Sequence, residues 1–69
     1  MLEEYLKKYR KKHNLSQKEM AERLFTSQAY YSLIEKGKVK PGHSMICRIA
    51  RAVSVSESYI SKLVYDNNK

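Results

Sequence analysis

Two serines that can begin helices, Ser16 and Ser27, stand only 11 residues apart. Ser16 is followed three positions later by Glu19, the spacing at which two side chains cap each other's backbone amides at a helix start. Ser27 is also of a residue type that caps helices and is the second cap candidate. Only one short helix and a tight turn fit between the two serines. Helices joined by so short a turn cross at a steep angle, so the spacing predicts a helix-turn-helix unit over residues 16–37.

Apolar residues recur at helical spacing along the rest of the chain. A first helix is predicted from the i, i+3, i+4, i+7 pattern of Leu2, Tyr5, Leu6 and Tyr9. It closes at residues 13–14, because asparagine tolerates the left-handed conformation just past a helix end. The residues of the helix-turn-helix unit expected to face inward are Met20, Ala21, Leu24, Tyr31 and Ile34.

Two more helices are predicted in the second half of the chain. The third helix ends at Lys36 and Gly37, and a basic loop with Pro41 follows. A fourth helix runs over about residues 43–53, and a fifth begins after the capping Ser56. Apolar and polar residues do not alternate over a strand's length, so the expected fold class is all-α, with five short helices.

Composition limits the partners of the chain. Its 69 residues form one domain over residues 1–65 with a frayed tail at 66–69, and 14 Lys and Arg against 7 Asp and Glu give a net charge of +7. Such a charge points to a polyanion, either nucleic acid or an anionic membrane surface. Apolar runs are far shorter than the roughly 20 residues of a membrane span, so a cytoplasmic protein is expected. The single Cys47 cannot form an internal disulfide.

The helix-turn-helix segment carries a recognisable pattern. Its matching residues are Ser16, Gln17, Ala21, Ser27, Ser32, Ile34, Glu35 and Gly37. Further matches beyond the segment are Pro41, Ile46, Ile49, Ala50, Val53, Val55 and Ile60. In these residues the chain resembles the phage-repressor, Cro-like and xenobiotic-response-element (XRE) regulators. The resemblance implies a compact five-helix, lambda-repressor-like domain that binds double-stranded DNA.

The resemblance also implies roles for individual residues. Arg10 and Glu35 would form a partly buried ion pair. The third helix would lie in the major groove, where the residues expected to contact base edges are Gln28, Ala29 and Leu33. The residues expected to contact the DNA backbone are Gln17, Ser27, Tyr30, Ser32, Lys36, Lys38 and Lys40.

Domains of this kind usually bind as two-fold dimers on half-sites about 34 Å apart. The dimer surface would include Tyr59, Leu63 and Tyr65. The resemblance therefore implies a bacterial or phage-encoded repressor that occupies an operator as a homodimer, with no cofactor, no small-molecule substrate and no membrane partner.

The sequence departs from the family pattern at several positions. Phe25 stands where the family has glycine, and a left-handed backbone there would cost on the order of 1 kcal/mol. Thr26, Tyr31 and His43 replace apolar residues, so a less apolar core is expected. His43 and Cys47 lie four residues apart, but two ligands are too few for zinc and the sequence shows no third. We therefore expect a half-buried histidine, an inert cysteine and no metal, and no set of residues that indicates an enzyme.

Two other classes of function remain open on the sequence. One is a protein-interaction module on the same fold, such as an antitoxin, an adaptor or a coactivator, which would dock a partner on the apolar carboxyl end. The other is a basic amphipathic binder of membranes or RNA. Gln17, Gln28 and the loop lysines favour DNA, because only DNA docking explains them together.

Overall fold

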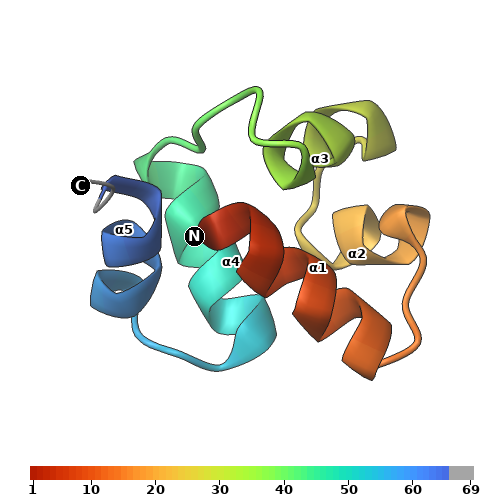
Figure 1. Cartoon of the computed structure of the whole chain (residues 1–69), viewed down its shortest axis with the longest axis horizontal. Coiled ribbons are helices and arrows are strands. Elements are labelled where there is room, and N and C mark those ends of the chain that lie inside the picture. Colours follow the sequence, from red (N-terminus) through yellow and green to blue (C-terminus); the bar gives the residue numbers. More distant parts are fainter. Residues whose placement is uncertain (66–69) are drawn as a thin grey trace.

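The computed structural model describes residues 1–65, which contain helices and no strand. The helices are α1 (Leu2–Lys12), α2 (Gln17–Arg23), α3 (Gln28–Glu35), α4 (His43–Val53) and α5 (Glu57–Tyr65) (Figure 1). The predicted all-α fold of five helices is thereby confirmed. The frayed tail expected at 66–69 lies outside the described residues. None of the five helices has the length and apolar character needed to cross a bilayer.

Three helices begin at the serine caps that the sequence predicts. Ser16 Oγ accepts a hydrogen bond from the Glu19 amide at 3.0 Å, and Glu19 Oε1 accepts one from the Ser16 amide at 2.8 Å. Ser27 and Ser56 each accept a hydrogen bond from the amide three residues later, at 3.1 and 3.0 Å. These bonds satisfy amides that a helix start otherwise leaves without partners.

The first four helices end in one shared backbone geometry. A residue with positive φ follows each of them, and the next residue donates its amide to the carbonyl five positions back. The four positive-φ residues are Asn14 (55°), Phe25 (57°), Gly37 (76°) and Ser54 (60°). This is the Schellman helix ending, which favours glycine or asparagine at the left-handed position. Asparagine and glycine fill two of the four positions, and Phe25 fits its position least well.

Helix α1 lies between the two halves of the domain. In Figure 1 it crosses the middle of the view, with α2 and α3 on one side and α4 and α5 on the other, and it contacts both α3 and α5. The buried apolar residues are Leu2, Leu6, Met20, Ala21, Leu24, Tyr31, Ile34, Met45, Ile46, Ile49, Ala50, Val53, Ile60 and Val64. All five inward residues expected in the helix-turn-helix unit belong to this core.

The turn between α2 and α3 is fixed by hydrogen bonds to its backbone. The Thr26 amide donates to the Ala21 carbonyl at 3.0 Å, and Arg48 Nη1, from α4, donates to the Phe25 carbonyl at 3.2 Å. The Phe25 side chain is 82% exposed. The turn is thus held by its main chain, and the phenyl ring adds little packing to offset the left-handed backbone.

We predict that Phe25→Gly raises the free energy of unfolding by about 1 kcal/mol, because glycine removes the clash that a Cβ makes at positive φ. Urea unfolding of the two proteins measures the difference. Asn14→Gly is the matched control and should change stability less, because asparagine tolerates this conformation. A clear loss of stability in Phe25→Gly would show that the ring packs in solution.

Candidate nucleic-acid interface

A buried carboxylate joins the first three helices. Glu35, the last residue of α3, is 3% exposed and is the charged residue buried within the described part of the chain. Arg10 Nε and Nη2 donate to its two oxygens at 2.8 and 3.0 Å. The Tyr31 hydroxyl and Gln17 Nε2 also donate, at 2.6 and 3.0 Å, so each carboxylate oxygen accepts two hydrogen bonds. Arg10 Nη1 reaches on to the Leu15 carbonyl at 3.0 Å, which ties in the turn between α1 and α2.

These contacts keep Glu35 ionised. Burial alone would raise its pKa, but hydrogen bonds from Arg10, Tyr31 and Gln17 overcome that effect and hold the pKa at about 2. Burial, followed by the hydrogen bond to Glu35 and its negative charge, raises the pKa of the Tyr31 phenol. The ion pair that the resemblance implies between Arg10 and Glu35 therefore exists inside a larger network.

Gln17 has a role that the sequence did not predict. Its side chain is half-buried and donates to Glu35, so it links α2 to the end of α3. One amide hydrogen of Gln17 is used inside the protein, and a DNA phosphate could take only the other. Gln17 therefore does not argue for DNA as strongly as the sequence suggested, and its phosphate contact stays a prediction.

The outer face of α3 is open to solvent. Gln28, Ala29 and Leu33, the predicted base contacts, are all exposed, and Leu33 is 39% exposed. Tyr31 and Ile34 on the opposite face are buried. The helix thus presents one amide side chain and two apolar side chains outward, while its inner face is fixed in the core.

The other α3 residues predicted to contact the DNA backbone differ in their surroundings. Ser27 is exposed, and its hydroxyl oxygen accepts the capping bond while its proton remains available to donate. Ser32 is half-buried. Tyr30 is half-buried and packs against the hydrophobic core. Part of the Tyr30 ring therefore serves packing, and only its exposed part can meet a ligand.

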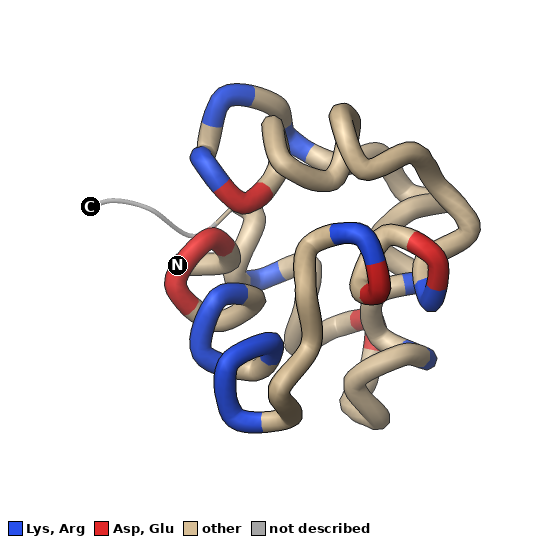
Figure 2. The backbone as a smooth tube through the Cα atoms, turned by 90° about the vertical axis from the view of Figure 1, so that its right-hand side faces the viewer, with Lys and Arg blue, Asp and Glu red and all other residues tan. Residues whose placement is uncertain are grey.

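The loop after α3 alternates between outward lysines and inward apolar residues. Lys38 and Lys40 are exposed, whereas Val39 is half-buried and Pro41 is buried. Lys36, at the end of α3, is also exposed. Figure 2 shows that the acidic first turn of α1 separates this basic stretch from the lysines of α1. The loop lysines thus form a distinct positive edge beside α3.

The aromatic residues predicted at the dimer surface already have contacts within the chain. Tyr59 is 45% exposed and meets the Tyr5 ring edge-on, with centroids 5.7 Å apart. Tyr65 is 58% exposed, and Lys40 Nζ lies 5.8 Å from the centroid of its ring. Leu63 is half-buried against the core. The exposed apolar area on α5 therefore comes mainly from the two tyrosines.

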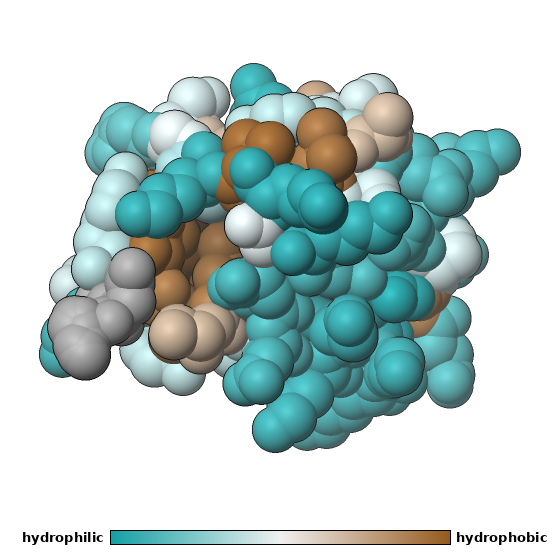
Figure 3. Space-filling view, turned by 45° about the horizontal axis from the view of Figure 1, so that its top comes forward, coloured by the Kyte–Doolittle hydropathy of each residue, from teal (hydrophilic) through white to brown (hydrophobic). Residues whose placement is uncertain are grey.

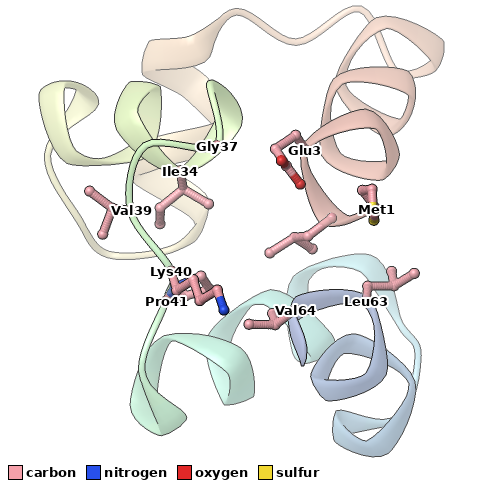
Figure 4. Close-up of a pocket in the computed structure, with 10 residues that line it drawn as sticks. Met1, Glu3, Ile34, Gly37, Val39, Lys40, Pro41, Leu63 and Val64 are labelled. Carbon is pink, nitrogen blue, oxygen red and sulfur yellow. The ribbon is translucent and has the colours of Figure 1, made fainter. Parts of the chain in front are cut away.

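A hollow lies where the start of α1, the loop after α3 and α5 meet, with a volume of about 240 Å³. Figure 3 shows hydrophobic residues in a hollow of a mostly hydrophilic face. In the close-up, Ile34, Val39, Pro41 and Val64 line it, and Lys40 lies beside Pro41 (Figure 4). Its volume is below the roughly 300–1,000 Å³ usual for small-molecule sites.

The surroundings of His43 and Cys47 on α4 differ from what the sequence predicts. His43 is exposed rather than half-buried, and Cys47 is half-buried. The sequence shows no third ligand near them, but in the structure Glu57 of α5 brings a carboxylate within 4.8 Å of the other two donor atoms. This contact has no signal in the sequence, because Glu57 lies ten residues beyond Cys47 on another helix. The Tyr31 contact did have a signal, because Tyr31 and Glu35 are four residues apart on one helix.

The fold and this surface together define a class of protein: an all-helical helix-turn-helix domain whose second motif helix is exposed beside a basic loop. A family model described as "Helix-turn-helix" matches residues 6–60. The chain belongs to this family, the XRE-type regulators that include phage repressors and Cro-like proteins, and is a DNA-binding regulator of that kind. The family is typically not enzymatic. No curated protein and no solved structure gives a significant match to the chain.

We predict that Arg10→Met lowers the free energy of unfolding by about 3 to 5 kcal/mol, because it leaves the buried carboxylate of Glu35 without its cation. Lys7→Met is the matched control on the exposed side of α1 and should change stability by less than about 0.5 kcal/mol. Chemical unfolding of both variants at neutral pH measures the effect. An Arg10→Met protein as stable as the control would contradict the importance of the ion pair.

Glu35 should also make stability depend on pH. Its pKa is lowered from 4.5 to about 2 in the folded protein. The contribution of ionised Glu35 to the free energy of unfolding is therefore complete above pH 4.5 and is lost as the pH falls towards 2. We predict that the difference in the free energy of unfolding between wild type and Glu35→Gln decreases as the pH falls from 4.5 towards 2. Chemical unfolding of both proteins at a series of pH values measures this difference. A difference that does not change with pH would contradict the lowered pKa of Glu35.

Proposed function

We propose that this chain is a sequence-specific regulator that binds double-stranded DNA and represses transcription by occupying an operator. The observation that carries the proposal is the exposed outer face of α3, held in place by the Glu35 network. The major groove of DNA admits a helix of this size, and a glutamine can pair with adenine through two hydrogen bonds. Gln28 would read adenine in this way, while Ala29 and Leu33 would contact thymine methyl groups.

The basic loop supports phosphate binding beside that helix. Lys36, Lys38 and Lys40 are exposed next to α3, and the whole chain carries a net charge of +7. Lysines that neutralise phosphates release counterions, which makes the affinity fall steeply with salt. In this proposal the exposed parts of Gln17, Ser27, Tyr30 and Ser32 make further contacts to the DNA backbone.

Two copies of the chain would bind one operator. The exposed rings of Tyr59 and Tyr65, together with Leu63, would meet their counterparts across a two-fold axis, at least when DNA holds the two copies close. Each copy would then place its α3 in one of two half-sites about 34 Å apart. Such a repressor would act in the cytoplasm of a bacterium, on the chromosome or on phage DNA.

A second candidate is a protein-interaction module on the same fold. The exposed aromatic rings of Phe25, Tyr59 and Tyr65 favour it, because exposed apolar side chains are common at protein interfaces. Such a module would not need Gln28 or the loop lysines for its activity.

Selection of bound sites from random duplexes, at a stated salt concentration, tests the DNA proposal. We expect a two-fold symmetric sequence and an affinity that falls steeply with rising salt. No enriched sequence, combined with an affinity indifferent to salt, would favour the interaction module instead.

We predict that Gln28→Ala weakens binding to the selected site by about 1 to 3 kcal/mol and relaxes the preference at one base pair of each half-site. Titrations with the selected duplex and with duplexes changed at single positions measure both effects. Equal loss on every duplex would assign Gln28 to the DNA backbone instead of a base.

Two lysine variants serve as controls for this experiment. Lys38→Gln should weaken binding to all duplexes alike. It should also make the plot of log affinity against log salt concentration less steep by about 0.9 for each copy bound. Lys8→Gln removes the same charge from the exposed side of α1. It should leave both the base preference and the salt dependence of the affinity nearly unchanged.

A further inference from the structure

Three metal-binding side chains meet where α4 and α5 adjoin. His43 is the first residue of α4, Cys47 lies one turn further on the same helix, and Glu57 is the first residue of α5. The left-handed Ser54 and the capping Ser56 turn the chain so that α5 begins beside α4. The donor atoms of the three side chains all lie within 4.8 Å of one another. Neither the Glu35 network nor the proposed DNA surface uses them.

The separation of these atoms fits a single zinc ion. Zinc binds imidazole nitrogen at about 2.0–2.1 Å and thiolate sulfur at about 2.3 Å in tetrahedral sites, which places the two ligand atoms about 3.6 Å apart. His43 Nε2 and Cys47 Sγ are 3.8 Å apart. Zinc can therefore bind between them with little movement. Because His43 and Glu57 are exposed, their side chains can close around the ion without any change in the core.

The chemistry of the three donors also favours zinc. Magnesium and calcium prefer sites made only of oxygen ligands, whereas zinc accepts nitrogen, sulfur and carboxylate oxygen together. Zinc that binds the Cys47 thiolate would release the thiol proton, and the zinc charge would be balanced by the thiolate and the Glu57 carboxylate.

We propose that His43, Cys47 and Glu57 form a zinc site that clamps the start of α5 to α4, with water as the fourth ligand. Three protein ligands and one water are a common zinc coordination set. The site does not depend on the proposed DNA function. Its direct consequence is on stability, because the unfolded chain does not hold the two helices together and a ligand of the folded state alone raises the melting temperature.

The test uses the full chain without a histidine tag, kept reduced with a phosphine. Isothermal titration with zinc chloride should give one ion per chain and release of a proton. At about one hundred times the dissociation constant, zinc should raise the melting temperature by roughly 10 to 20 °C. Cobalt(II) should give the thiolate-to-cobalt absorption bands and the ligand-field intensity of tetrahedral coordination.

Single variants separate the three-ligand site from weaker alternatives. His43→Ala, Cys47→Ser and Glu57→Gln should each weaken zinc binding at least tenfold, whereas the matched controls His13→Ala and Glu22→Gln should not. Unchanged binding in both His43→Ala and Glu57→Gln would overturn the proposal, because the thiol alone would then hold the ion. A ratio of one zinc per two chains, with dimers seen by sedimentation, would overturn it as well, as would the absence of a melting shift.

Discussion

The buried carboxylate of Glu35 is the constraint on which the helix-turn-helix half of the domain depends. A charge removed from water is costly unless it is fully hydrogen-bonded, and here Arg10, Tyr31 and Gln17 supply all four bonds. These donors come from α1, α2 and α3. The chain can therefore bury Glu35 only when all three helices are in place, and this makes their relative positions specific as well as stable.

That constraint acts directly on the proposed function. Glu35 and Tyr31 fix the inner face of α3, so the opposite face, with Gln28, Ala29 and Leu33, is presented in one orientation. A reading helix gains specificity only when its side chains are held at defined positions. The same network uses one amide hydrogen of Gln17, a residue that the family resemblance places at a DNA phosphate. In the proposed function, Gln17 would therefore both support α3 and contact DNA.

The other half of the domain is organised differently. Helices α4 and α5 pack mainly through apolar residues such as Ile49, Val53 and Ile60, and the described residues of these two helices contain no buried charge. Their junction instead gathers His43, Cys47 and Glu57 near the surface. In the present proposals, the first half of the domain reads DNA through a rigid helix, and the second half carries the dimer surface and a zinc site that stabilises the helix pair.

The sequence by itself determined the five helices, because capping serines and apolar spacing are local: Ser16, Ser27 and Ser56 all cap as predicted. The family resemblance, rather than local spacing, implied that Arg10 and Glu35 are partners and that Gln28, Ala29 and Leu33 face outward. Only the tertiary structure decided that Gln17 and Tyr31 complete the Glu35 network, and that Glu57 joins His43 and Cys47. These contacts join residues on different helices or depend on which way a side chain turns, and local spacing does not encode the angles at which helices pack.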